Sequence, residues 1–155
     1  MKPLKLAYIS YLIARPSRDL IVAAHQELTR EWWESGRMEF DSFVSELVIR
    51  ESGAGDLIAA GRRLTELAAI PVLALTDEAV TLARDLIERE ILPKAAADDA
   101  MHIGLATVHA MDYLLTWNCR HIANARIRPA VTARCVAQGY TLPIICTPEE
   151  LMGGL

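Results

Sequence analysis

Short apolar segments rich in β-forming residues alternate along this chain with longer segments of helical periodicity. We expect strands at residues 4–12, 39–44, 71–75, 112–117 and 142–146. We expect helices at residues 17–34, 45–51, 56–69, 95–111, and beginning at 76 and at 147. Alternation of strands and helices is typical of parallel α/β proteins. The predicted fold is therefore a central parallel sheet flanked by helices.

The helix starts are marked by residues that favour the N-cap position. These residues are Ser17, Ser45, Asp56, Thr76 and Thr147. Leu20, Ile21, Ala24, Leu28 and Trp32 fall on one side of the first helix. Because Trp32 and Trp33 are adjacent on that helix, we expect one of them in the core. The other would contribute to a surface for a partner protein or a second copy of the chain.

With 155 residues, the chain is long enough for one domain, which we assign to residues 1–155. Its formal net charge of −4 means that nucleic-acid binding would have to come from a local basic patch. Three cysteines, with no CxxC pair, favour a reducing cytoplasm over a disulfide scaffold or a zinc site. No apolar run approaches the roughly 20 residues of a membrane-spanning helix. We therefore expect a cytoplasmic protein with no membrane partner.

The N-terminus has some features of a signal peptide, since Lys2 and Lys5 precede the apolar run 6–14. However, Arg15-Pro16 follows at once and no small-x-small cleavage pattern is present. We therefore expect this segment to belong to the fold.

Two glutamates on the helix after Ser45 are candidate site residues. Glu51 lies four residues after Leu47 and three after Val48, on the side of core-facing groups. Glu46, at the helix start, suits the helix dipole and could pair with Arg50. The site interpretation therefore fits Glu51 better, although a carboxylate at a helix end is often simply solvated.

A second candidate acid begins the helix at 95–111. Asp99 aligns with His102, Ile103 and Ala106 on one helix face. Asp98 or Asp99 could alternatively cap the helix, and a histidine like His102 is more often a hydrogen-bonded core residue than a ligand.

Polar residues follow the strand expected at 112–117. Asn118 lies just beyond its carboxyl end, where ligands bind in open parallel sheets, and Thr116 could point to the same side. A basic cluster follows in the otherwise acidic chain: Arg120, His121, Arg126 and Arg128. Such a cluster could bind phosphate or could be a solvated loop.

Two carboxylates and an amide oxygen are hard ligands of the kind that Mg²⁺ or Mn²⁺ selects. Such a cation can activate water and neutralise charge on a phosphodiester during hydrolysis. The combination of Glu51, Asp99 and Asn118 therefore predicts metal-dependent phosphodiester chemistry.

With these residues, the chain resembles the PIN-domain family, in particular VapC-like toxins of type II toxin–antitoxin systems. The resemblance covers nearly the whole chain. It is carried by FVSELVIRE (43–51), DDAMHIGLA (98–106), YLLTWNCRHIAN (113–124) and PIICTPEEL (143–151). It implies a PIN-like three-layer fold and a metal-dependent ribonuclease that is held inactive by an antitoxin protein.

The resemblance also assigns roles to residues of this chain. Glu51 matches the family's helix glutamate, with Glu46 as the alternative, and Asp99 matches the aspartate of the later helix. Asn118 stands where many members have a second aspartate, and Thr116 matches the small hydroxyl residue beside it. These assignments make Glu51, Asp99, Asn118 and Glu46 the candidate catalytic and metal-binding residues for Mg²⁺ or Mn²⁺. Arg120 and His121 are candidate contacts to RNA phosphate.

The sequence departs from the family pattern in its opening segment. PIN domains end the first strand with an acid followed by hydroxyl residues, whereas here Tyr8-Ile9 runs into Ser10-Tyr11-Leu12, as though several residues had been removed. Asp19 is an unsuitable replacement, because we expect it inside the first helix. Fewer carboxylates bind a hard cation more weakly.

The departure leaves a second reading open, in which a PIN-fold protein has lost nuclease activity and still binds an antitoxin or RNA. A third reading, a nucleotide-binding α/β domain, has no direct support because no Gly-rich phosphate loop follows any strand.

Overall fold

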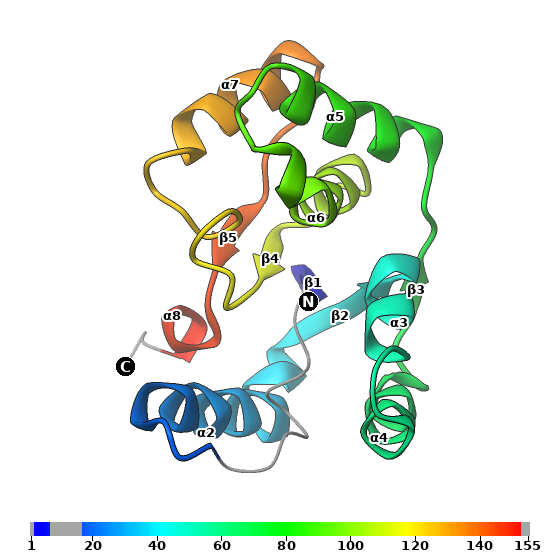
Figure 1. The fold of residues 1–155 in the computed structure, drawn as a ribbon, viewed down its shortest axis with the longest axis vertical. Helices are drawn as coiled ribbons and strands as arrows, with labels where there is room; N and C mark the ends of the chain where they lie inside the picture. Colours follow the sequence, from blue (N-terminus) through cyan, green and yellow to red (C-terminus); the bar gives the residue numbers. More distant parts are fainter. Residues whose placement is uncertain (1, 7–16, 153–155) are drawn as a thin grey trace.

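The computed structural model describes residues 2–6 and 17–152 of the chain (Figure 1). Its strands are β1 (Lys2–Leu6), β2 (Phe40–Ser45), β3 (Val72–Leu73), β4 (Tyr113–Leu115) and β5 (Ile144–Cys146). The described strands form one parallel sheet in the order β3-β2-β1-β4-β5. Because parallel strands run in one direction, their carboxyl ends lie along the same edge of the sheet.

Helices connect these strands. The α-helices are α2 (Leu20–Glu34), α3 (Glu46–Ser52), α4 (Leu57–Leu67), α5 (Asp77–Glu88), α6 (Ala97–Val108), α7 (Arg128–Ala137) and α8 (Pro148–Met152). Two short 3₁₀ turns, η1 (Gly36–Glu39) and η2 (Lys94–Ala96), precede β2 and α6.

The sheet separates two layers of helices (Figure 1). Helices α5, α6 and α7 pack on one face, against Leu114 of β4 and Ile145 of β5. Helix α2 and the α8 segment pack on the other face, against Leu115 and Cys146. Successive strand residues point to opposite faces, which explains why neighbouring residues serve different cores. The prediction of a central parallel sheet flanked by helices is confirmed.

Several predicted caps are also confirmed. The side chains of Ser45, Asp56 and Thr76 accept hydrogen bonds from the first turns of α3, α4 and α5. Thr147 likewise accepts one from the backbone N–H of Glu150 in α8. Short polar side chains provide this interaction from local sequence alone, so these helix starts could be predicted.

The start of α2 was predicted wrongly. Its N-cap is Asp19, whose carboxylate accepts hydrogen bonds from the N–H groups of the first turn, and not Ser17. Asp19 therefore precedes the helix instead of lying inside it. Leu20 and Ile21 are 86% and 69% exposed, and Ala24 is exposed as well. The buried residues of α2 are Gln26, Thr29, Trp32 and Trp33, so only Trp32 of the predicted apolar side is buried.

Both tryptophans of α2 are buried, whereas only one was expected in the core. Trp32 packs near Phe40, and the guanidinium of Arg37 lies 3.9 Å from the ring centroid of Trp33. This cation–π contact covers the second ring, which therefore cannot form a partner surface.

Two further differences concern element boundaries. Helix α7 was not predicted; Arg128-Pro129 at its start and Val131 with Cys135 as its buried pair are its sequence signals. The strand expected at 4–12 begins at Lys2 and is described only to Leu6, so the departure from the PIN pattern after residue 6 lies outside the described residues.

An ion pair joins α5 to α7. Asp85 Oδ2 lies 2.7 Å from Arg134 Nε, and Asp85 Oδ1 lies 2.9 Å from Arg89 Nε.

Within the described ranges, no helix is long and apolar enough to cross a membrane.

Candidate functional site

Glu51 contacts the neighbouring helix α6. Its Oε1 lies 2.7 Å from Nε2 of His102, whose side chain is only 4% exposed, while the Glu51 side chain is 45% exposed. The preceding turn of α3 places Leu47 in a buried cluster with Leu105 of α6. The expected alignment of Glu51 with core-facing residues of α3 is thus confirmed.

Glu46 is positioned differently. Its Oε2 accepts a hydrogen bond of 2.9 Å from the backbone N–H of Leu75, in the connection from β3 to α5. Glu46 therefore stabilises a loop conformation, while Glu51 faces α6. This arrangement favours Glu51 over Glu46 as the site glutamate.

Asp99 lies in the first turn of α6 but does not cap it, because the N-cap residue is Ala96 and makes no side-chain hydrogen bond. Instead, Asp99 faces the loop after β4. Its Oδ1 accepts a hydrogen bond of 2.9 Å from Nδ2 of Asn118, and its Oδ2 lies 3.0 Å from Nδ1 of His121. The side chains of Asp99 and His121 are 23% and 22% exposed, so solvent reaches both.

Asn118 uses its whole side-chain amide within this network. While Nδ2 donates to Asp99, Oδ1 accepts from the backbone N–H groups of Arg120 (3.2 Å) and His121 (3.0 Å). The hydroxyl of Thr116 accepts a hydrogen bond from the backbone N–H of Asn118 at 2.9 Å. Since a carbonyl oxygen has two lone pairs, the Asn118 oxygen is occupied in this conformation. Its contacts suit a role in orienting Asp99.

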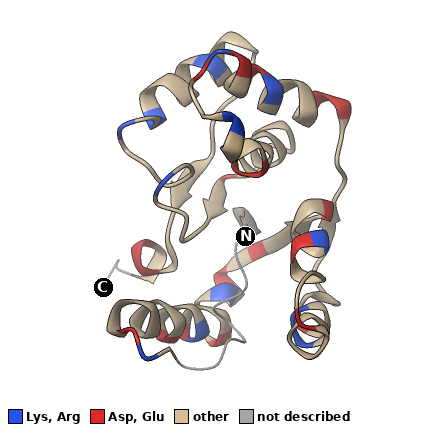
Figure 2. Ribbon diagram, in the orientation of Figure 1, with Lys and Arg blue, Asp and Glu red and all other residues tan. Residues whose placement is uncertain are grey.

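A second asparagine fixes the rest of the basic loop. Nδ2 of Asn124 donates to the backbone oxygen of Arg120 at 2.7 Å, and its Oδ1 accepts from the backbone N–H of Arg126 at 2.9 Å. The backbone positions of both exposed arginines are thereby set by side-chain hydrogen bonds. Figure 2 shows basic residues and no acid along the connection from β4 to α7.

Trp117 anchors the same loop to α2. Its Nε1 donates a 2.7 Å hydrogen bond to the hydroxyl of Thr29, which in turn donates to the backbone oxygen of His25. The rings of Trp117 and His25 stack with centroids 3.9 Å apart. Sequence reasoning gave Trp117 no role, because these contacts join segments far apart in the chain.

The two candidate carboxylates are both linked to helix α6. Glu51 contacts His102, which lies three residues after Asp99, and residues at this spacing share one face of a helix. Glu51 thus contacts a residue that lies one helical turn from Asp99 on α6. His102 is buried and hydrogen-bonded, as expected, but its partner Glu51 was not foreseen. The three-residue spacing from Asp99 to His102 was the one sequence signal that could have placed His102 beside the site.

The donor set fits a hard cation in type. Nowhere in residues 2–6 and 17–152 do three side chains of His, Cys, Asp or Glu gather closely enough to hold a metal ion by themselves. Mg²⁺, however, is commonly bound through one or two carboxylates, with water and substrate phosphate completing its coordination. Glu51 and Asp99, both partly exposed, match this requirement.

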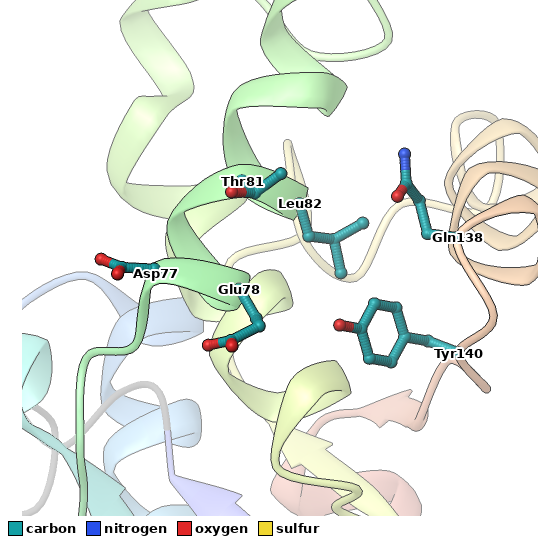
Figure 3. Close-up of a pocket in the computed structure, with 6 residues that line it drawn as sticks. All are labelled: Asp77, Glu78, Thr81, Leu82, Gln138 and Tyr140. Atoms are coloured by element: carbon teal, nitrogen blue, oxygen red, sulfur yellow. The ribbon is translucent and has the colours of Figure 1, made fainter.

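The structure also contains a cavity of about 240 Å³ between the start of α5 and the segment after α7. It is lined by Asp77, Glu78, Thr81, Leu82, Gln138 and Tyr140 (Figure 3). None of the predicted site residues lines it, so it is separate from the network around Asp99.

No protein-family model matches this sequence, and no curated protein is significantly similar to it. The fold defines an α/β protein with a parallel sheet between helical layers. A similar fold occurs in a chain of the crystal structure of VapBC2 from Rickettsia felis bound to a DNA fragment from their promoter. The match covers 94% of this chain and 98% of that chain, with a TM-score of 0.53 and 11% sequence identity. At this identity the likeness shows a common fold.

Proposed function

We propose that this protein is a VapC-like ribonuclease that hydrolyses RNA phosphodiester bonds with Mg²⁺ or Mn²⁺. The proposal is supported by the contact of Glu51 with His102, which lies three residues after Asp99 on α6, within a fold similar to a VapBC2 chain. The sequence motifs around both residues also resemble those of PIN domains.

The residues around the proposed cation have two roles. Glu51 and Asp99 would hold the cation, which when bound supplies charge neutralisation at the phosphate and activation of water. Asn118 orients Asp99 through the Nδ2–Oδ1 hydrogen bond. Orientation of a ligating carboxylate by an outer hydrogen bond commonly matters for metal affinity.

RNA phosphates would bind along the loop after β4. Arg120 is exposed and its backbone is fixed by Asn118, while Arg126 is fixed in the same way by Asn124. A guanidinium on a fixed backbone loses less freedom on binding a phosphate. His121 lies in the same loop, and its Nδ1 contacts Asp99, so only its other ring nitrogen would be free to reach a phosphate.

The proposed protein partner is an antitoxin, as the similar chain comes from a complex named VapBC2. Since both tryptophans of α2 are buried, the exposed apolar residues at its start, Leu20 and Ile21, are the better candidates for contact on this helix. A homodimer and a cytoplasmic location complete the proposal.

The test is cleavage of single-stranded RNA with Mn²⁺ by wild-type protein and two variants, Asp99→Ala and Glu51→Gln. Both variants should lose activity by at least about 100-fold, because each removes a charged ligand. Asp98→Ala is the matched control, since Asp98 is an exposed acid in the same helical turn. Equal cleavage by wild type and Asp99→Ala would refute the catalytic assignment.

One structural observation favours a second candidate function, an impaired PIN-fold protein that binds an antitoxin or RNA without cleaving it. The Asn118 oxygen is occupied by two backbone N–H groups, so the site offers two carboxylates and no third open oxygen from this loop. A melting temperature unchanged by millimolar Mn²⁺, together with retained partner binding, would favour this function.

A further inference from the structure

The position of Glu51 depends on a single described contact to a buried group. Glu51 lies near the end of a seven-residue helix, and its side chain is nearly half exposed. A glutamate in this setting ordinarily samples several rotamers. Here its Oε1 lies 2.7 Å from Nε2 of His102, and His102 is a buried residue of α6.

Two neighbouring contacts make this arrangement stiff. Leu47 and Leu105 share a buried cluster one turn away, which fastens α3 against α6. Two residues further along α6, Gly104 lies so close to α5 that an added Cβ would be 2.7 Å from the backbone oxygen of Ala79. His102 is therefore carried by a helix with little freedom to shift.

We infer that His102 is a positioning residue, which holds the Glu51 carboxylate beside Asp99 so that both can reach one cation. This inference rests on the proposed function. A carboxylate has no hydrogen to donate, so His102 Nε2 is the donor in this contact. Donation to Oε1 leaves Oε2 available for the cation, and the burial of His102 keeps the imidazole itself from binding it.

The test is Mn²⁺ binding to the full chain, measured by electron paramagnetic resonance without RNA. His102→Ala should weaken Mn²⁺ binding by about 10- to 100-fold, the usual effect of removing a group that orients a metal ligand. His102→Gln retains an N–H donor and should recover part of the affinity. The matched control is His109→Ala, because His109 Nε2 makes a comparable 2.8 Å contact to the backbone oxygen of Ala74.

A double-variant cycle separates positioning from a general effect on folding. In a Glu51→Ala background, His102→Ala should cause no further loss of Mn²⁺ affinity, since its target is already absent. An equal loss in both backgrounds would overturn the inference, as would wild-type affinity in His102→Ala. In either case the proposed function would stand if wild type binds Mn²⁺. Failure of wild type to bind would overturn the proposed function and this inference together. Circular dichroism of each variant verifies that it is folded.

Discussion

Replacing Asn118 by aspartate gives a direct test of the site geometry. Asn118→Asp introduces an acid at this place, but it also removes the donor that faces Asp99. An oxygen would then stand 2.9 Å from Asp99 Oδ1, where Nδ2 of the amide now donates a hydrogen bond. Without a cation, two carboxylates would face each other.

The magnitude follows from this distance. Two unit charges at 2.9 Å repel by about 1.4 kcal/mol in water and by about 6 kcal/mol at an effective dielectric constant of about 20. The Asp99 side chain is 23% exposed, and the N–H groups of Arg120 and His121 would still donate to residue 118. We therefore expect a loss near the lower limit, about 2 kcal/mol, which lowers the melting temperature by about 4–8 °C for a chain of this size.

The assay is thermal unfolding in EDTA and in Mn²⁺. A cation between the two carboxylates reverses their repulsion, and a ligand at 100 times its Kd stabilises a protein by about 2.7 kcal/mol. Asn118→Asp should therefore melt below wild type in EDTA and gain more from Mn²⁺ than wild type does. Asn124→Asp is the control, because Asn124 Nδ2 faces the neutral backbone oxygen of Arg120.

Two results would refute this reasoning. If Asn118→Asp melts at the wild-type temperature in EDTA, its side chain does not face Asp99. If it is destabilised but Mn²⁺ restores nothing, the geometry is right and the site does not hold a cation.

Packing and ionisation elsewhere give three more expected outcomes. Gly104→Ala should lower the free energy of unfolding, measured in urea, by about 1–3 kcal/mol, because the new Cβ would lie 2.7 Å from a backbone oxygen. Gly61→Ala is the control and should not destabilise the protein, because its new Cβ would have no atom within 4 Å. Burial raises the pKa of the Cys146 thiol to about 12. In the native protein, a thiol reagent at pH 8 should therefore label exposed Cys119. It should leave the buried Cys135 and Cys146 unmodified until the protein unfolds. Burial opposes ionisation of Asp85, but hydrogen bonds from two arginines outweigh it and hold its pKa below the usual value. The resulting stabilisation is present above about pH 4 and is lost as the pH falls through the lowered pKa, so Asp85→Asn should cost about 1.5–3 kcal/mol at neutral pH and progressively less in acid.

Local patterns accounted for much of the architecture. Ser45, Asp56 and Thr76 identified helix starts because N-capping involves only the next few residues. The strand at 112–117 and the face of α3 that carries Glu51 could likewise be read from periodicity. Helix α7 was missed because only two of its ten residues, Val131 and Cys135, are buried, which leaves a weak periodic signal.

The contacts within the site could not be derived from local patterns. Asp99 and Asn118 are 19 positions apart, and Glu51 reaches a histidine on another helix. The sequence predicted which side chains were candidates but not that Asn118 would use its oxygen on backbone N–H groups. Burial of Trp33 was missed for a similar reason, since it depends on a core cluster shared with Val44 of β2 and Leu115 of β4 and on Arg37 lying over the ring.

The contacts of Trp117 with Thr29 and His25 connect helix α2 to the loop after β4, which lies beside the site. Any ligand that displaces α2 must break the 2.7 Å hydrogen bond and the ring stack, and thereby releases the residue that precedes Asn118. Thermodynamic reciprocity requires the converse: a ligand that tightens the loop at Asp99 also resists displacement of α2. Displacement of α2 and occupancy of the carboxylates would then oppose each other through the contacts of Trp117 with Thr29 and His25.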